Sequence, residues 1–341
     1  MSDQDTPFPI GKLPPEQLAE LLQKHTFSLP HDRVLVRPGV GEDAAVIDMG
    51  NRWLVAKTDP ITFATDEIGW YAVQVNANDI AAAGGVPRWF LSTLLLPQDK
   101  TDQHLIERIM GQIAAACRAL DVVPCGGHTE ITYGLDRPII VGVMLGELEP
   151  SHLIRSSGLQ VGDVILLTKG TAIEGTAIIA REKEQELVTR FGAALIEQSK
   201  AFLHHPGISV VRDARIAVQT APIHAMHDPT EGGVATGLWE MAAASGVGLD
   251  VDRQAIPIAP HTQTLCQAFG LNPLGVIASG ALLIAVDPTD AEPVCAALRQ
   301  ANIQATPIAR AVPADRGLLL RSGDDVQPLP RFDQDEITRL F

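Results

Sequence analysis

The chain contains 341 residues, carries a formal net charge of −15 at neutral pH and is 46% hydrophobic. Its length exceeds one ordinary hydrophobic core and suits two domains of roughly 150 residues each. Nucleic acids are polyanions that proteins bind with clustered Lys and Arg, so the acidic balance and the lack of a basic cluster argue against a nucleic-acid partner. Aromatic residues make up only 4% of the chain, so the core is expected to consist of Ala, Val, Leu and Ile.

The start of the sequence and its cysteines favour a soluble, cytoplasmic protein. The first five residues include two acids, Asp3 and Asp5, and are not followed by an apolar segment, so no signal peptide is expected. No uninterrupted apolar run reaches the roughly 18 residues that a membrane span needs, so no membrane partner is expected. The four cysteines form no CxxC pair, which argues against a zinc ribbon or a thioredoxin-like site.

The first half of the chain predicts a sheet with helices packed on it. A polar extension, residues 1–30, contains a short helix at 15–23 that begins with Pro. Apolar residues at helical spacing predict two long helices, at 68–83 and 101–120. The expected strands are at 44–48, 53–57, 88–96, 122–125 and 138–145.

A polar stretch at 151–162 marks a domain boundary, and a second set of strands and helices follows it. The expected strands are at 163–168, 224–227, 248–251, 281–286, 306–311 and 317–321. The expected helices are at 174–190, 195–203, 210–219, 234–245 and 290–301. Long helices and paired strands in both halves favour an α+β fold over a doubly wound parallel sheet.

Four parts of the chain follow from this pattern. They are an N-terminal extension at 1–30, an N-terminal domain at 31–150, a C-terminal α/β domain at 151–323 and a tail at 324–341. The tail is polar, so we expect it to be loosely held.

Acidic residues occur beside Gly, Asn or Thr in four separate segments. These are Gly39-Val40-Gly41-Glu42-Asp43-Ala44-Ala45, Lys57-Thr58-Asp59, Asn76-Ala77-Asn78-Asp79 and Asp228-Pro229-Thr230-Glu231-Gly232-Gly233. Mg²⁺ prefers oxygen ligands and commonly contacts one or two carboxylates together with substrate phosphates. Glycines let backbone N–H groups approach phosphates, and a helix that starts after the last of these segments would direct its positive end at an anion. The four segments therefore predict a magnesium–nucleotide site.

Each of these acids has a plain structural alternative, because an Asp near Gly commonly closes a turn or caps a helix. Asp79 is the most informative, since it lies in a strongly apolar helical segment where an uncompensated carboxylate is costly. Its alternative is a solvated helix face.

A loop is expected at Gly126-Gly127-His128-Thr129-Glu130, after the strand at 122–125. There His128 is a candidate metal ligand, proton carrier or phosphate donor, or a plain loop histidine. The segment Gly39-x-Gly41-x-x-Ala44 matches a loosened dinucleotide fingerprint, but that fingerprint needs a strand before it and a helix after it. Here Arg37-Pro38 precedes it and paired strands follow, which argues against a nicotinamide site.

Taken together, the motifs resemble the aminoimidazole ribonucleotide synthetase superfamily, and within it the hydrogenase-maturation HypE branch. The resemblance extends from about residue 11 to residue 321. Its most specific pieces are Gly41-Glu42-Asp43-Ala44-Ala45-Val46, Thr58-Asp59, the segment from Asn78-Asp79 to Val86-Pro87, and Asp228-Pro229-Thr230-x-Gly232-Gly233.

This resemblance implies an N-terminal domain that forms a homodimer by pairing its sheets, and a C-terminal α/β domain beside it. It also implies ATP in a cleft between the domains, with Mg²⁺ on Asp43, Asp59, Asp79 and Asp228. The residues expected to contact the nucleotide are Gly41, Glu42, Asp43, Thr58, Asn78, Gly126, Gly127, Thr230, Gly232 and Gly233. Lys57 is expected to neutralise phosphate charge, and His128 is expected to transfer a proton.

The sequence departs from each branch of the superfamily. HypE carries its substrate on a C-terminal cysteine, whereas no Cys follows Cys295 here. Selenophosphate synthetase uses an N-terminal Cys or selenocysteine, and the first Cys here is Cys117. Thiamine-monophosphate kinase would have Asp at position 128, and the DGVGTK-like segment of the synthetase that names the superfamily is missing.

We therefore expect a HypE-like enzyme that uses ATP and Mg²⁺ to activate or phosphorylate an amide, carboxylate or alcohol oxygen of a small molecule. A protein that holds nucleotide without catalysis, as a partner in a maturation complex, is the alternative. A hydrolase that uses a metal with His128 and nearby acids, without ATP, is a third reading.

Overall fold

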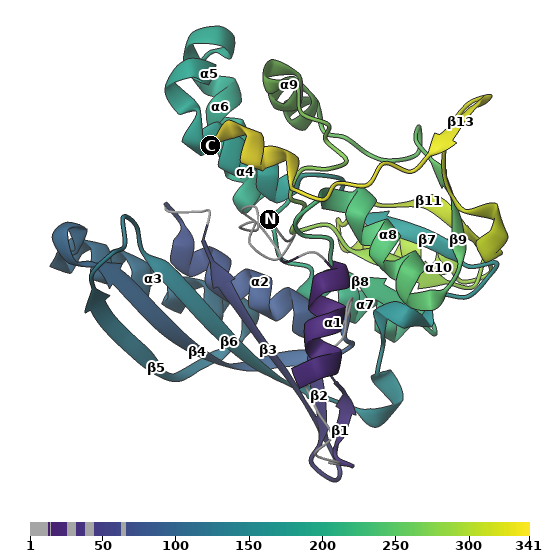
Figure 1. The fold of residues 1–341 in the computed structure, drawn as a ribbon, viewed down its shortest axis with the longest axis horizontal. Helices are drawn as coiled ribbons and strands as arrows, with labels where there is room; N and C mark the ends of the chain where they lie inside the picture. Colours follow the sequence, from purple (N-terminus) through teal and green to yellow (C-terminus); the bar gives the residue numbers. More distant parts are fainter. Residues whose placement is uncertain (1–12, 14, 26–31, 38–43, 63–65) are drawn as a thin grey trace, which may run out of the picture.

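The structure, a computed structural model, describes residues 13, 15–25, 32–37, 44–62 and 66–341. Two units lie side by side, each built around one sheet, and helices of both units meet between the sheets (Figure 1). This mixed architecture confirms the α+β class expected from the sequence. The exact domain limits stay a prediction.

The first sheet has six strands in the order β1-β2-β3-β6-β4-β5. Neighbours are antiparallel except β4 and β5, which are parallel because helix α3 crosses over between them. The strands are β1 (Val34–Val36), β2 (Ala45–Asp48), β3 (Trp53–Ile61), β4 (Val86–Pro97), β5 (Val123–Thr132) and β6 (Ile139–Leu148). The helices are α1 (Pro15–His25), α2 (Ile68–Ala82) and α3 (Gln103–Leu120).

Helix α2 is buried on almost every side, because all of its residues except Trp70 are buried. A helix that is apolar all round must pack on more than one side. One side of α2 contacts β3, β6 and α3, and another contacts α7 of the second unit. Gly69 permits the close approach to α3, because a Cβ at this position would lie 2.6 Å from the carbonyl oxygen of Ile109.

The second sheet has seven strands in the order β13-β12-β9-β11-β7-β10-β8. The strands are β7 (Val164–Thr168), β8 (Ala225–His227), β9 (Gly248–Asp252), β10 (Leu283–Val286), β11 (Ala305–Val312), β12 (Leu318–Ser322) and β13 (Asp325–Pro328). The helices are α4 (Ile173–Glu182), α5 (Glu184–Phe191), α6 (Ala193–Lys200), α7 (Val211–Thr220), α8 (Gly233–Ser245), α9 (Pro260–Phe269) and α10 (Ala291–Gln300). Short 3-10 turns connect several of these elements.

Two expectations about the elements are wrong, and one helix was missed. The helix predicted at 174–190 is two helices, α4 and α5, because the backbone leaves the helical region at Lys183 (φ −112°). Residues 126–130 belong to strand β5 rather than to a loop. Helix α9 was not predicted, although a Pro at its start and a left-handed Gly270 at its end are ordinary helix boundaries.

The tail is also held more firmly than its polar composition predicts. Strand β13 pairs with β12, and Ile337 is 2% exposed within the hydrophobic core. The ring of Phe332 lies against the backbone of Gly275, where a Cβ would be 2.5 Å from the ring. Two widely spaced apolar side chains thus attach an otherwise polar segment.

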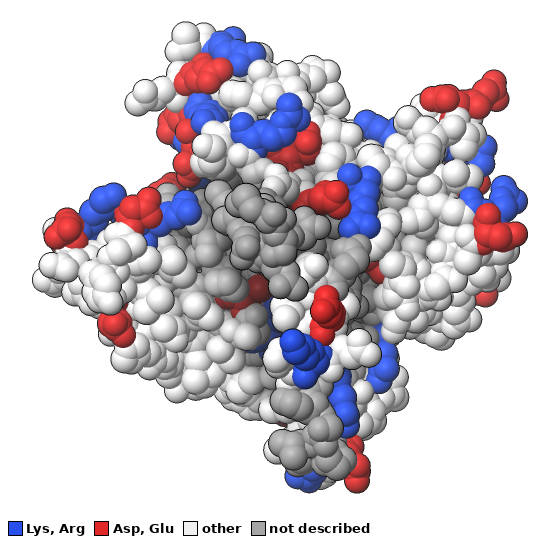
Figure 2. All heavy atoms as spheres, viewed as in Figure 1, with Lys and Arg blue, Asp and Glu red and all other residues white. Residues whose placement is uncertain are grey.

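Charged side chains are mixed over the face in Figure 2, where Lys and Arg alternate with Asp and Glu rather than forming one basic area. Within the described ranges, no helix combines the length and the apolar character needed to cross a bilayer.

Candidate active site

A lysine between two carboxylates forms the centre of the candidate site. Lys57 and Asp59 are two residues apart on β3, so their side chains lie on one face of the strand. Asp79 reaches them from α2. The ammonium nitrogen of Lys57 lies 3.2 Å from Asp79 Oδ2 and 3.6 Å from Asp59 Oδ2. Because Asp79 is only 5% exposed, its carboxylate needs this nearby cation.

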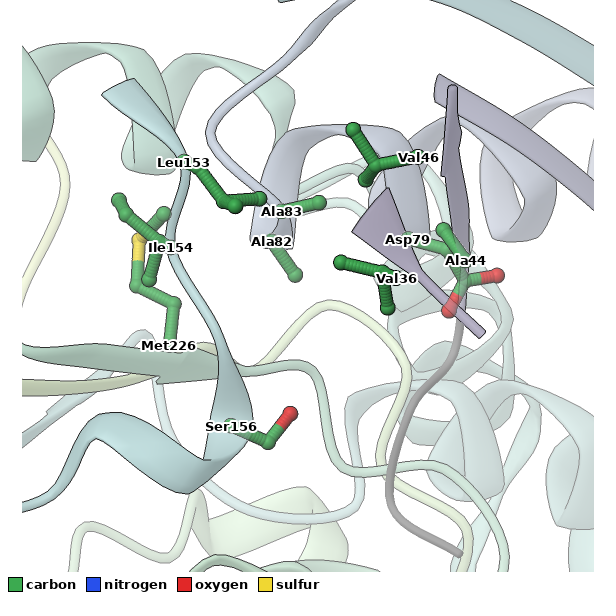
Figure 3. Close-up of a pocket in the computed structure, with 10 residues that line it drawn as sticks. All are labelled: Val36, Ala44, Val46, Asp79, Ala82, Ala83, Leu153, Ile154, Ser156 and Met226. Carbon is green, nitrogen blue, oxygen red and sulfur yellow. The ribbon is translucent and has the colours of Figure 1, made fainter. Parts of the chain in front are cut away.

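A small pocket opens beside Asp79 (Figure 3). Most of its lining is apolar and comes from both units of the molecule. The lining residues are Val36, Ala44, Val46, Asp79, Ala82, Ala83, Leu153, Ile154, Ser156 and Met226. The pocket therefore offers a largely uncharged space with one carboxylate at its edge.

The chemistry of the described acids suits Mg²⁺ better than a transition metal, because carboxylates supply only oxygen ligands. Asp228 follows β8 and is 2% exposed, and Met226, two residues before it, lines the same pocket as Asp79. In the described part of the chain, no three His, Cys, Asp or Glu side chains gather closely enough to hold a metal ion. A magnesium ion here would thus take several ligands from phosphates and water. Gly41, Glu42 and Asp43 lie outside the described residues.

Thr58 does not join this group of side chains. It alternates with Lys57 and Asp59 along β3, so its side chain lies on the opposite face of the strand. There its hydroxyl donates to the carbonyl oxygen of Gly142 at 2.9 Å. Strand alternation therefore separates Thr58, the central residue of this motif, from Lys57 and Asp59.

Asn78 contacts the second unit of the protein through both atoms of its amide. Its Nδ2 donates to the carbonyl oxygen of Ile208, and its Oδ1 accepts from the backbone N–H of Val210, each at 2.8 Å. The same short segment is held from the other side by Lys169, whose Nζ donates to the carbonyl oxygen of Ser209 at 2.5 Å. Asn78, which was expected to contact nucleotide, thus clamps the two units together.

Lys169 is itself a buried cation in a left-handed backbone conformation (φ 60°). Its ammonium lies 3.2 Å from Asp213 Oδ1, and both side chains are nearly inaccessible. Burial lowers the pKa of Lys169, and the Asp213 carboxylate opposes that shift. This ion pair holds the start of α7 against the end of β7.

The glycines after Asp228 have backbone conformations that other residues rarely adopt, with φ of +77° at Gly232 and +65° at Gly233. The N–H of Gly232 donates to Asp335 Oδ2 at 2.7 Å, and the N–H of Gly233 donates to the carbonyl oxygen of Thr230 at 3.0 Å. A Cβ on Gly233 would lie 2.5 Å from the carbonyl oxygen of Leu274. These glycines serve turn geometry and close packing, and their N–H groups are bonded within the chain.

Gly126, Gly127 and His128 lie on β5, at the edge of the first sheet. Two strands separate β5 from β3, so His128 is roughly 14 Å from Lys57 within one chain at the usual strand spacing. The side chain of His128 is 65% exposed, and its Nε2 lies 3.4 Å from Glu130 Oε2. The structure therefore does not bring His128 to the lysine–aspartate group of the same chain.

Two buried acids near the glycine segment were not predicted. Glu174, at the start of α4, is 5% exposed, and burial raises its pKa to about 8. Asp335 is 7% exposed, and burial raises its pKa to about 6, although N–H groups of Ile337 and Gly232 oppose the shift. Glu174 stands in the apolar run Ala172-Ile173-Glu174-Gly175, which is the same signal that singled out Asp79.

Comparison with known proteins gives two domain matches. Residues 41–148 match the N-terminal domain, and residues 160–319 the C-terminal domain, of AIR synthase related protein. Carbamoyl dehydratase HypE of Cupriavidus necator is 30% identical over 287 residues, which cover 82% of this chain and 78% of that protein.

Solved structures of HypE share the fold. HypE in complex with ATP aligns with a TM-score of 0.73 at 23% identity, covering 88% of this chain and 92% of that one. A HypE–HypF complex aligns with a TM-score of 0.73 at 19% identity, covering 86% of this chain and 94% of that one.

Proposed function

Because the chain belongs to the AIR synthase related protein family, we propose that it binds ATP with Mg²⁺ and transfers the γ-phosphoryl group to an oxygen of a small molecule. The observation that carries the proposal is the position of Lys57 between the carboxylates of Asp59 and Asp79. Phosphoryl transfer depends mainly on positioning and on neutralising charge, and acids for a metal beside a lysine are suited to both.

Each group has a separate task in this proposal. Asp59, Asp79 and Asp228 would hold Mg²⁺ together with Asp43, and Lys57 would turn from the carboxylates toward phosphate oxygens. When bound, the metal supplies charge neutralisation on the transferred group.

A homodimer is part of the proposal. The face of the first sheet that is turned away from α2 carries half-buried apolar side chains of Val141, Val143 and Leu145. At the edge of the sheet, Val123 is 57% and Ile131 54% exposed. An apolar surface of this kind is typical of a protein interface. Pairing of two sheets would cover it and would place His128 near the second copy.

ADP formation by the purified protein, with and without Mg²⁺, tests the proposal. Amides, carboxylates and alcohols are supplied in turn as acceptors. We expect Mg²⁺-dependent ADP formation that one acceptor class stimulates, and a loss of about 10²-fold or more in Asp79→Asn, as for removal of a charge-stabilising group. Asp99→Asn, at an exposed position far from the site, is the control. Full activity and Mg²⁺ dependence in Asp79→Asn would rule out the metal assignment.

One observation favours a second candidate, a nucleotide-holding accessory protein of a maturation complex. The N–H of Gly232, which was expected to bind phosphate, donates instead to the carboxylate of Asp335. Tight Mg²⁺-dependent nucleotide binding without ADP formation under any condition would support this candidate. Capture of the partner by the nucleotide-loaded protein, compared with nucleotide-free protein, would then identify the complex.

A further inference from the structure

Glu174 is a buried carboxyl whose hydrogen bonding is incomplete. It is 5% exposed, and its Oε2 is buried without a hydrogen-bond partner among the described residues. Its neighbours on α4, Ile173 and Gly175, are also buried. Buried polar groups are normally bonded, and exceptions gather where a ligand or a reaction uses them.

The position of Glu174 links it to the segment that carries Asp228. The N–H of Gly175 donates to the carbonyl oxygen of Ile277 at 3.1 Å, and the N–H of Ala278 donates to that of Thr230 at 3.3 Å. Residues 276–279 thus form a bridge between the start of α4 and the segment 228–233. A Cβ on Gly175 would lie 2.2 Å from Val276 Cγ1, so the backbone at the start of α4 packs closely against this bridge.

Charged and titratable groups face Glu174 from several elements. Burial raises the pKa of Glu174, the Glu231 and Asp335 carboxylates add to that rise, and Ser279, on the bridge, opposes it. Tyr71 approaches from α2 of the first unit, and both burial and Glu174 raise the pKa of its hydroxyl, against the effect of Arg181. Glu174 therefore lies where α2 of the first unit, the glycine segment and the tail converge.

We propose that Glu174 is a catalytic residue of the acceptor subsite and removes a proton from the acceptor as its oxygen is phosphorylated. The inference rests on the proposed function. Glu174 takes the proton from an O–H bond of an alcohol or an N–H bond of an amide, while the acceptor oxygen forms a bond to the γ-phosphorus. The bond from that phosphorus to the β,γ-bridging oxygen breaks, and its electron pair leaves with ADP. The proton then passes from Glu174 to water.

The burial of Glu174 suits this role for two reasons. A carboxylate that is hard to ionise is a stronger base once it is ionised, and a base works best when its pKa lies near the working pH. Exclusion of water also protects the transferred group from hydrolysis. The three acids that meet here, Glu174, Glu231 and Asp335, disfavour an anionic acceptor, so an uncharged amide or alcohol fits better than a carboxylate.

The variants Glu174→Gln and Glu174→Asp test the inference, with acetamide, acetate and ethanol as acceptor probes. Glu182→Gln is the matched control, because Glu182 is exposed at the far end of the same helix. We expect Glu174→Gln to bind Mg·ATP as the wild type does but to lose about 10²–10⁴-fold in probe-stimulated ADP formation, the usual contribution of a general base. Glu174→Asp should retain part of the rate.

The pH profile separates a catalytic from a structural role. In the wild type, the stimulated rate should rise with pH to a plateau above the pKa of Glu174, at about 8, and this rise should be missing in Glu174→Gln. An unchanged rate and rise in Glu174→Gln would overturn the inference.

If the wild type forms no ADP, the proposed function is wrong, but the role of Glu174 can still be tested. A titration of Glu174 that requires no turnover provides this test. Infrared difference spectra between the wild type and Glu174→Gln report the ionisation of this single carboxyl. Ionisation near pH 8 that acetamide or ethanol displaces supports the inference. Ionisation in the ordinary range of a glutamic acid, or a titration that none of the three probes moves, overturns it.

Discussion

The carboxylate of Asp335 accepts the N–H of Gly232 at 2.7 Å, so the tail of the chain bonds directly to the segment that follows β8. The other oxygen of Asp335 accepts the N–H of Ile337 at 2.8 Å, which shapes the turn that buries Ile337. One buried side chain thus joins the tail to the glycine segment across more than one hundred residues of sequence.

Removal of this side chain should destabilise the protein. We expect Asp335→Ala to lower the free energy of unfolding by about 1–3 kcal/mol, because two buried N–H groups lose their acceptor. Asp335→Asn retains one acceptor oxygen and should cost less. Urea denaturation measures the difference, and Asp324→Asn, at an exposed position of the tail, is the control. Equal stability of Asp335→Ala and Asp324→Asn would contradict the role of the tail.

Two glycines with the same backbone conformation separate strain from packing. Gly233 (φ +65°) and Gly246 (φ +66°) both lie in the left-handed region, but a Cβ on Gly246 meets no atom within 4 Å. Gly246→Ala should therefore cost only about 1–2 kcal/mol of conformational strain. Gly233→Ala should cost clearly more, because its Cβ would lie 2.5 Å from the carbonyl oxygen of Leu274. Thermal unfolding of the two variants compares them, and equal losses would contradict close packing at Gly233.

Asn78 should matter for stability before it matters for nucleotide affinity. Asn78→Ala removes the partners of the Ile208 carbonyl and the Val210 N–H, so we expect a loss of about 2–4 kcal/mol, at roughly 1–3 kcal/mol for each buried unsatisfied group. Hydrogen exchange of the Val210 amide should also become faster in Asn78→Ala, because this N–H loses its acceptor. Asn51→Ala, in an exposed turn, is the control. If Asn78→Ala had unchanged stability but weaker ATP binding, the main role of Asn78 would be to contact the nucleotide.

The stability of the protein should fall as pH rises above about 5. The pKa of Glu174 is raised by burial from 4.5 to about 8 in the folded state, so the folded state holds its proton more tightly than the unfolded state does. Stability from this proton is complete below the unfolded pKa and is lost as pH approaches 8. Asp335, whose pKa burial raises to about 6, adds to the lower part of this range.

Glu174→Gln should flatten this pH dependence, because glutamine has no proton to lose. At about 1.4 kcal/mol for each pKa unit, the difference between pH 5 and pH 8 should amount to a few kcal/mol. Urea denaturation of the wild type and Glu174→Gln at both pH values measures it. If the stability of the two proteins changes with pH in the same way, the pKa of Glu174 in the folded state is that of an ordinary glutamic acid.

Sequence patterns predicted those parts of the fold in which burial is periodic. The apolar run of α2 identified both the helix and the unusual acid within it, Asp79. Strand β5 was cut short at Cys125 because an edge strand that is exposed on both faces has no alternation of burial. The tail was misjudged because two apolar residues in a polar segment, Phe332 and Ile337, attach it.

The candidate site was predictable as a set of motifs but not as a geometry. Lys57, Asp59 and Asp79 were expected together and lie together. Thr58 and Asn78 are adjacent in sequence to that group. Strand alternation nevertheless places the side chain of Thr58 on the opposite face of β3, and the side chain of Asn78 bonds to the second unit. Such outcomes depend on which elements meet in space, and sequence adjacency carries little information about that.

The hydrogen bonds of Asn78 also bear on the order of folding. They join residues 130 and 132 positions apart, and the closure of such long loops is costly in entropy until both partners are already structured. Each unit must therefore build its own core before these bonds can form, which makes them a late event. Interactions formed late change the unfolding rate more than the folding rate, so Asn78 governs how long the two units remain docked rather than how quickly they find each other.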